Sequence, residues 1–384
     1  MIYDFIKSTS AVSLGLNKDA QSTLLENVSF FDNLDVDFKS FNIAIIGVEE
    51  DRGTPKNIGT KDAPDHIRRA LYSLSSPSKE LTIIDLGNIQ AGAELKDSYY
   101  ALSHILEELL KAKVFAIILG GGQDLSLAQF NAYERIKPCI NFVSIDESFD
   151  LDKSMHSGQS YLMDVFTKEN NHLFHFSNIG YQSYFVHDHV LASLEKMRFD
   201  AFRLGYFKNN ITETEVILRD ADMISLDISA IKQSDAPAHK NASPNGFYSE
   251  EICQITRYAG ISNKLSSFGL YELNPHFDQN NHSAMLFAQS IWYLFDGYAN
   301  RHFEKPEKSN NNYIRYEVDS EDESNNLVFW KSKKSGRWWM EIPNGNKAIS
   351  FKKEHIVSCT YGDYQEACNG EIPNRWLSAY EKLA

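Results

Sequence analysis

The sequence is poor in cysteine and has no long apolar run. Its 384 residues include four cysteines, Cys139, Cys253, Cys359 and Cys368, and none has the CxxC or Cys/His spacing of a zinc site. Few, scattered thiols are typical of a reduced, cytoplasmic protein. No run approaches the ~18 apolar residues of a membrane helix. The first residues, MIYDFIKSTS, lack the basic and apolar pattern of a signal peptide.

Basic residues are also scarce relative to acidic ones. The chain has 38 Lys+Arg against 52 Asp+Glu, which gives a formal net charge of -14. Nonspecific binding to nucleic acid needs a basic face, so this balance argues against it. Hydrophobic residues make up 42% of the chain, enough for a substantial core, and the 23% of charged residues argues against wholesale disorder. We therefore expect a folded cytoplasmic protein with no nucleic-acid partner and no membrane insertion.

Short apolar segments alternate with helical patterns over the first three hundred residues. The apolar segments lie at 42–48, 82–86, 114–119, 141–146, 200–204, 222–227 and 266–271. The helical patterns lie at 63–73, 98–112, 189–198, 249–259 and 283–296. Segments this apolar suit strands that are buried on both faces, and their alternation with helices predicts a mainly parallel α/β sheet.

The pattern changes near residue 303. Polar and acidic runs fill residues 303–326, which is typical of a solvated linker. Residues 327–384 then hold four of the five tryptophans. We therefore divide the chain into an α/β domain at 1–302, a linker at 303–326 and a small, tryptophan-rich module at 327–384.

The module begins with a hairpin pattern. Residues 327–332 and 337–342 flank a turn-like Lys-Lys-Ser-Gly segment, and a short helix is expected around 373–382. Successive residues of a strand point to opposite faces, so Trp338 and Trp339 should do so. One face is then expected to pack on the α/β domain and the other is a candidate surface for a protein partner.

Polar clusters follow three of the predicted strands. They are Gly120 to Asp124, Asp146 to Asp150, and Asp227 to Ser229. The carboxyl ends of parallel strands share one sheet edge, where ligands collect. Converging carboxylates there indicate either a hard cation or raised pKa values. The alternative is that each Asp caps a following helix or turn.

These clusters resemble those of the ureohydrolases, the family of arginase, agmatinase and formimidoylglutamase. GGGQD at 120–124, DESFD at 146–150 and SLDIS at 225–229 are similar to that family's Gly-Gly-Gly-His-Asp, Asp-x-His-x-Asp and Ser-x-Asp-x-Asp, in the same order. Flanking landmarks resemble the family too, in GTKDAPDHIR, in DLG and in YELNP. The segment SGQSYL at 157–162 is closer to formimidoylglutamases than to arginases. The resemblance covers roughly residues 40–300 and implies an arginase-like three-layer α/β/α sandwich.

The resemblance also implies a site with two Mn²⁺ ions held by two His and four Asp. The six ligand positions correspond to Gln123, Asp146, Ser148, Asp150, Asp227 and Ser229. Gln123 and Ser148 stand where the family has His, and Ser229 stands where it has Asp. Gln123, Asp146, Asp150 and Asp227 are then the candidate ligands of a degenerate metal site. Since both imidazoles are gone, we expect no cofactor or, at most, one Mg²⁺, Ca²⁺ or Mn²⁺ ion.

Two further expectations concern charge. Glu272 matches the family carboxylate that engages the substrate guanidinium, so it is the candidate catalytic residue, with a salt bridge to a local Arg or Lys as the alternative. The clustered carboxylates need a cation, a proton or a basic side chain, and Lys153, His156 and Lys232 are candidates for the last. We expect instead that hydrogen bonds from Gln123, Ser148 and Ser229 stabilise the clustered carboxylates.

Together these features predict a ureohydrolase-fold protein that is a catalytically inactive binding or scaffold protein. The alternative is a metal-dependent hydrolase of linear amidines, which would cleave carbon–nitrogen bonds with a single altered metal site. A third reading is a small-ligand sensor that uses Glu272. Family members often form trimers or hexamers, which makes a homo-oligomer a candidate assembly.

Overall fold

The computed structural model describes most of the chain. The described residues are 5–17, 22–32, 36–151, 160–169, 171–306, 311–319, 326–343 and 355–383. Within these ranges, no helix has both the length and the apolar character needed to cross a membrane.

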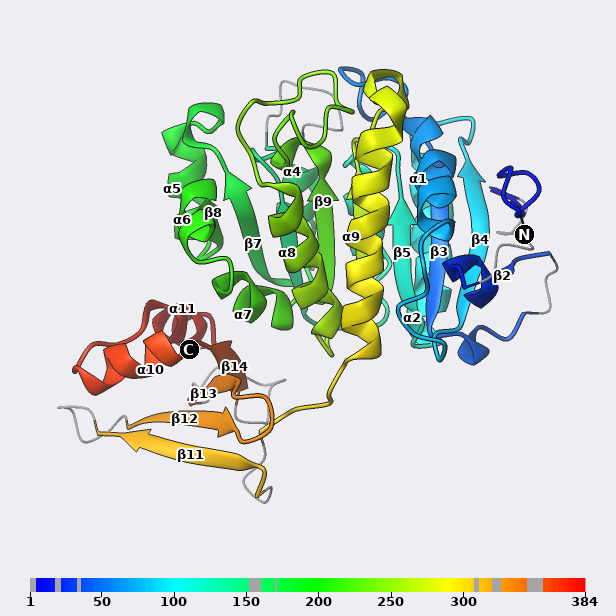
Figure 1. The fold of residues 1–384 in the computed structure, drawn as a ribbon. Helices are drawn as coiled ribbons and strands as arrows, with labels where there is room; N and C mark the ends of the chain where they lie inside the picture. The colour runs from blue at the N-terminus through cyan, green and yellow to red at the C-terminus, as the bar shows by residue number, and fades with distance from the viewer. Residues whose placement is uncertain are drawn as a thin grey trace.

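A ten-stranded, mainly parallel sheet forms the centre of the larger part of the molecule (Figure 1). Its order is β1-β4-β3-β5-β10-β9-β6-β7-β8, with β2 also beside β4, and β1 runs antiparallel to β4. The strands are β1 (Ile6–Lys7), β2 (Val28–Phe30), β3 (Ile43–Glu49), β4 (Ile83–Gln90), β5 (Phe115–Leu119), β6 (Ile140–Ile145), β7 (Leu173–Tyr181), β8 (Asp200–Arg203), β9 (Met223–Asp227) and β10 (Ser267–Tyr271).

All seven predicted strands are present; β1, β2 and β7 were not predicted, and the longest of these three is β7. Its sequence, LFHFSNIGY, interrupts the apolar pattern with His175, Ser177 and Asn178. Ser177 and Asn178 are nevertheless buried, because β7 lies inside the sheet between β6 and β8. A polar residue in a buried strand hides the strand from an analysis of hydrophobicity alone.

Helices cover both faces of the sheet and confirm the predicted three-layer α/β/α architecture. They are α1 (Ala63–Tyr72), α2 (Leu95–Lys111), α3 (Leu125–Asn131), α4 (Tyr161–Phe166), α5 (Asp188–Lys196), α6 (Leu204–Asn209), α7 (Glu213–Arg219), α8 (Ser249–Ile261) and α9 (His282–Ala299). Side chains of α1 and α6 to α9 share one buried core, and those of α2 to α5 share the other. Alternate residues of β3, such as Ile45 and Ile46, enter opposite cores.

The carboxyl-terminal module contains a four-stranded antiparallel sheet and two helices. The strands are β11 (Tyr313–Val318), β12 (Leu327–Ser332), β13 (Trp338–Ile342) and β14 (His355–Cys359), and the helices are α10 (Tyr361–Cys368) and α11 (Asn374–Leu383). Strands β12 and β13 form the predicted hairpin, whereas β11 lies within the segment expected to be a linker. Trp338 and Trp339 belong to separate buried clusters, as their opposite orientations require.

The module packs beneath α7, at the end of the sheet where β7 begins (Figure 1). The Arg219 guanidinium donates to the Trp338 carbonyl at 2.9 Å and lies over the Trp339 ring, 4.9 Å from its centroid. The Asp220 carboxylate accepts from the Ser358 backbone N–H at 2.9 Å and from its hydroxyl at 2.8 Å. These contacts fix the module to the α/β domain through charged groups as well as apolar ones.

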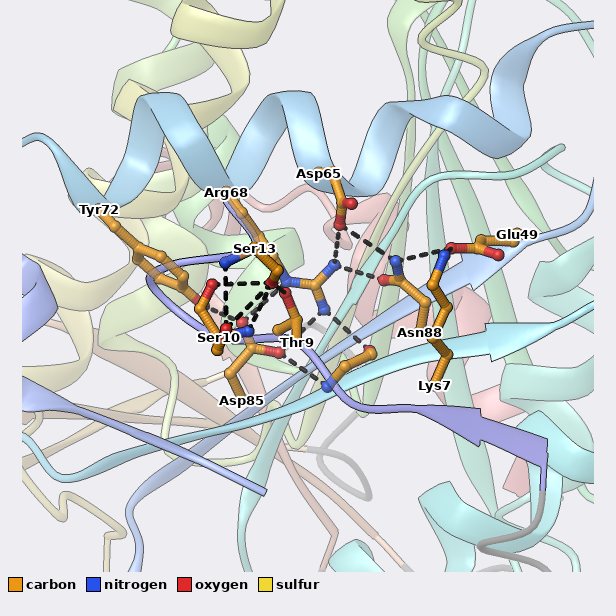
Figure 2. Close-up of polar contacts among 11 residues, drawn as sticks. Lys7, Thr9, Ser10, Ser13, Glu49, Asp65, Arg68, Tyr72, Asp85 and Asn88 are labelled. Atoms are coloured by element: carbon orange, nitrogen blue, oxygen red, sulfur yellow. Dashed lines mark hydrogen bonds and ion pairs between the residues drawn. The ribbon is translucent and has the colours of Figure 1, made fainter. Parts of the chain in front are cut away.

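A buried arginine ties α1 to β4 (Figure 2). The Arg68 guanidinium donates Nε–H to Asp85 Oδ2 at 2.8 Å and Nη2–H to Asp85 Oδ1 at 2.9 Å, and neither side chain is exposed. Tyr72 and Asn88 complete the network, and a Cβ on Gly120 would lie 2.8 Å from Cδ of Pro64, near the start of α1. Arg68 thus helps to set the position of α1 against the loops at the carboxyl edge of the sheet.

Replacing Arg68 by Met should destabilise the protein by about 3–5 kcal/mol, because Asp85 would remain buried without its cation. Urea unfolding followed by circular dichroism measures the free energy. Changing Asp85 to Leu as well should recover part of the loss, since no buried charge then lacks a partner. A cost below about 1 kcal/mol for the single change would show that this pair does not hold α1 in place.

Candidate functional site

A pocket opens at the carboxyl edge of the sheet, where β5, β6, β9 and β10 end. Its volume is about 160 Å³. The residues that line it are Thr54, Pro55, Lys56, Asn57, Gln123, Asp146, Glu147, Ser148, Asp150, Asp227, Ser229, His239, Asn241 and Glu272. The structure therefore brings together all seven residues that the sequence analysis assigned to the site.

The turn after β5 delivers Gln123 to this pocket. Gly120 and Gly121 have φ values of +75° and +77°, a conformation that residues with a Cβ rarely adopt. A Cβ on Gly121 would also lie 2.4 Å from Cδ1 of Leu125. Glycine at these positions lets the chain turn sharply enough to bring Gln123, which is only 1% exposed, beside Ser144 of β6 and Ser225 of β9.

Backbone N–H groups orient two of the carboxyl groups. Asp146 Oδ1 accepts from the Ser148 N–H at 3.0 Å, and Asp227 Oδ1 accepts from the Ser229 N–H at 2.7 Å. The Ser229 hydroxyl also donates to Asp146 Oδ1, at 3.3 Å. In each case the loop after the strand supplies the donor, so the second oxygen of each Asp is directed into the pocket.

The Gln123 amide occupies the space between three carboxyl groups. With its nitrogen turned toward them, it donates to Asp150 Oδ2 at 2.8 Å, Asp146 Oδ2 at 3.0 Å and Asp227 Oδ2 at 3.2 Å. In this orientation its oxygen accepts from the Ser225 hydroxyl at 3.2 Å. The reverse orientation would place the oxygen against carboxyl oxygens, so the hydrogen-bond network selects the first.

The two amide hydrogens of Gln123 cannot satisfy three carboxylates, and the pKa values of the acids are raised. Burial raises the pKa of Asp146 to about 6. Burial, reinforced by the charge of Asp146, also raises the pKa of Asp150 and Asp227 well above the usual range. The same two causes raise the pKa of Glu147 to about 8. Part of the cluster is therefore neutral at pH 7.

Glu272 is held by neutral donors in a left-handed turn. Its φ is +64°, and its N–H donates to the Gly121 carbonyl at 3.0 Å. Its carboxylate accepts from the Thr54 hydroxyl at 3.0 Å, the Asn57 amide at 2.8 Å and the Gln123 N–H at 3.1 Å. The expected alternative, a salt bridge to Lys or Arg, is not present among the described residues. Burial raises the pKa of Glu272.

None of the three basic side chains predicted to neutralise the carboxylates is found in the pocket among the described residues. Lys232 is a wrong prediction: its Nζ lies 3.4 Å from Asp235 Oδ1 and 3.6 Å from the centroid of the Tyr248 ring, and it does not line the pocket. Lys153 and His156 lie outside the described residues. His239 lines the pocket instead, and burial lowers its pKa to about 4, so it is neutral at pH 7.

The sequence analysis missed Thr54, Asn57 and Ser225. Thr54 and Asn57 lie in the loop after β3, more than two hundred residues from Glu272. Their one signal was position, since this loop follows a buried strand and so belongs to the same sheet edge. Ser225 was read only as part of the SLDIS segment, although its hydroxyl determines the orientation of the Gln123 amide.

Comparison with known proteins places this site in a family. A sequence profile of the arginase family matches residues 41–296. The chain therefore belongs to the arginase family. Formimidoylglutamases of Vibrio parahaemolyticus and Photorhabdus laumondii are similar to it, at 24% identity over 295 residues and 25% over 280 residues. The matches cover 68% and 66% of this chain, and 85% of each relative.

Solved structures show the same fold. The formimidoylglutamase of Bacillus subtilis is similar with a TM-score of 0.66 and 20% identity, covering 75% of this chain and 95% of that one. The formiminoglutamase of Trypanosoma cruzi with Mn²⁺ has a TM-score of 0.64 and 19% identity, covering 77% and 100%. At these identities the likeness establishes the fold.

The side chains of this chain do not fit a pair of Mn²⁺ ions. The Gln123 amide nitrogen, a donor, faces the carboxyl groups, and hydroxyls stand at two of the other ligand positions. No group of three or more His, Cys, Asp or Glu in the described ranges has a geometry suited to a metal ion. Mn²⁺ in a protein is typically bound by imidazole and carboxylate groups, and three of the six ligand positions here carry neither.

Changing Gln123 to Glu should destabilise the protein by roughly 2–4 kcal/mol at pH 8, because it adds a carboxylate to the cluster and removes the donor amide. Acids whose folded-state pKa is raised stabilise the fold fully below about pH 4, and that contribution is lost as the pH rises through the raised pKa. With Asp146 at about 6 and Glu147 at about 8, the loss falls between pH 4 and 8.

The deficit of the Gln123→Glu variant should therefore shrink as the pH is lowered from 8 to 5. Thermal unfolding in EDTA at both pH values measures it. The Gln365→Glu change, on the exposed surface of α10, is the control and should have little effect at either pH. Equal stability of Gln123→Glu and the parent protein at pH 8 would show that the added charge does not meet the three Asp.

Proposed function

We propose that this arginase-family protein binds a small organic cation in its acidic pocket without hydrolysing it. The ligand group would be a guanidinium, an amidinium or an ammonium. The observation that carries the proposal is the Gln123 amide, which donates to Asp146, Asp150 and Asp227 at the centre of the pocket. A binding role needs only the surrounding charge and shape, which the pocket retains.

Hydrolysis of an amidine at neutral pH needs an activated water molecule. In metallohydrolases the metal ions lower the pKa of that water. Here the carboxyl oxygens accept hydrogen bonds from Gln123, Ser148 and Ser229, and three of the acids hold protons more tightly than usual because they are buried. These residues favour retention of a ligand over attack on it.

Acidic side chains outnumber basic ones in the pocket, where five carboxyl groups accompany Lys56, and this balance favours a cationic ligand. Glu272 is bound by a hydroxyl, an amide and a backbone N–H, none of which carries charge. The His239 Nε2 atom lies 3.9 Å from Glu272 Oε2, but burial lowers the His239 pKa to about 4. Glu272 thus receives hydrogen bonds without a counter-charge, and a bound cation would supply one.

The hydrolase reading remains the specific alternative, since relatives named formimidoylglutamase are 24–25% identical. A single hard cation would require the Gln123 amide to present its oxygen in place of its nitrogen.

We further propose that the protein acts in the cytoplasm, consistent with its few scattered thiols. We also propose that the carboxyl-terminal module offers a surface to a second copy of the chain or to another protein.

We expect no urea or formamide release from arginine, agmatine or formimidoylglutamate, even with Mn²⁺ supplied, because both His ligand positions are occupied by Gln123 and Ser148. Colorimetric product assays and elemental analysis of the same sample test this. The thermal midpoint should nevertheless rise with agmatine, and the rise should be lost in Glu272→Gln. Two Mn²⁺ ions per chain with turnover of ~1–10³ per second would establish the hydrolase instead.

Restoring the family residues should restore metal binding. The triple change Gln123→His, Ser148→His and Ser229→Asp supplies the missing ligands, while the backbone N–H groups that orient Asp146 and Asp227 are unaffected. Calorimetry with Mn²⁺ should show at least one site, with partial rather than full affinity, because outer hydrogen bonds are not restored. A folded triple variant that stays free of metal would show that the backbone has diverged from the family geometry.

A further inference from the structure

A second cavity lies between the α/β domain and the carboxyl-terminal module. Its volume is about 510 Å³, within the range of about 300–1,000 Å³ that is usual for small-molecule sites. The domain contributes the first residues of β6, β7 and β8 together with part of α7, and the module contributes β14, α10 and α11. The cavity is therefore at the opposite end of the sheet from the acidic pocket.

One wall of the cavity is apolar. It is formed by Phe142, Val143, Phe202, Val216, Ile217 and Val357, which come from both parts of the molecule. Such a surface suits an aliphatic or aromatic body of about ten carbon atoms. Five of the six belong to the α/β domain, and the docked module adds Val357 of β14 to the wall.

A cation without a carboxylate partner lies at the other wall. The Lys382 ammonium contacts Nδ1 of His175, whose Nε2 lies 2.9 Å from Asp200 Oδ2. This chain of contacts requires Nε2–H on a neutral His175, in keeping with the lowering of its pKa by burial. Among the described residues, no carboxylate lies within ion-pair distance of Lys382.

A second cation on the same helix is only weakly paired. Arg375 is on the same face of α11 as Lys382, seven residues earlier. Its Nε has no hydrogen-bond partner, and its nearest carboxylates are Asp363 at 3.5 Å and Glu213 at 3.9 Å. Two cations that are not fully hydrogen-bonded therefore line the cavity.

Four acids line the cavity, and three of them, all except the exposed Glu366 of α10, are already satisfied. Asp220 accepts two hydrogen bonds from Ser358, Asp200 is bonded to His175, and Asp363 accepts from the backbone and hydroxyl of Thr360. Apart from Glu366, the unsatisfied polar groups are therefore donors and cations, on Lys382 and Arg375 of α11. They call for an acceptor that carries negative charge.

We propose that this cavity binds a small organic carboxylate with an apolar body, its carboxylate on Lys382 and Arg375 and its body against the apolar wall. Because both parts of the molecule line the cavity, binding would also stabilise the docked position of the module.

Isothermal titration of the full-length protein with 4-phenylbutyrate and with octanoate tests the proposal. One of the two should bind with a 1:1 stoichiometry and a Kd on the order of 0.1 mM, and its neutral amide should bind at least about tenfold more weakly. Lys382→Met should weaken the carboxylate about tenfold or more and leave the amide unchanged, whereas Lys382→Arg should keep most of the affinity.

Two further variants complete the design. Lys196→Met, the same change at an exposed lysine of α5, should bind the carboxylate as the parent does. Ser378→Trp, which fills the cavity from α11, should abolish binding. The proposal is overturned if neither acid binds saturably, if acid and amide bind equally, or if Lys382→Met binds like the parent. Since Lys382→Met adds no bulk, its result decides the matter even where Ser378→Trp fails to fold.

Discussion

Three carboxyl groups share one buried space, and their mutual repulsion is the constraint around which the pocket is built. At roughly 4 Å and an effective dielectric constant near 20, each ionised pair would repel by about 4 kcal/mol. This repulsion is reduced by the donor amide of Gln123, by backbone N–H groups and by protonation of the acids. None of these introduces a basic side chain, so the pocket is stabilised while its lining stays rich in carboxyl groups. The sharp glycine turn after β5 brings the amide to that space.

The same protein treats another buried carboxylate in the opposite way. Asp85 receives a full guanidinium charge from Arg68, together with hydrogen bonds, and both of these side chains are fully buried (Figure 2). In the pocket, by contrast, Glu272 and its neighbours are supported by dipoles only. A charge neutralised by another charge serves the fold, whereas a charge held by dipoles remains available to a ligand. The contrast separates the structural acids of this domain from those that can bind.

The sequence was informative wherever one physical rule dominated. Apolar segments bounded by turns identified seven strands, and the rule that parallel strands end at one edge predicted which residues would meet. Prediction from the sequence failed where the orientation or pairing of a side chain depended on residues far away in the chain. The orientation of Gln123 is set by Ser225 on β9, and Lys232 pairs with Asp235 rather than with the cluster. Strand β7 was missed because its buried polar residues break the pattern, and β11 because a polar edge strand resembles a linker.

Strand β6 runs from one cavity to the other. Its first residues line the space beneath the module, and Asp146 follows directly after its last residue. Six residues of strand span about 20 Å, a separation at which two unit charges interact by less than about 1 kcal/mol at an effective dielectric constant near 20. Charge placed in one cavity is therefore scarcely felt in the other. Any communication between the two ends would have to be mechanical, through displacement of the sheet itself, and a sheet packed between two layers of helices resists such displacement.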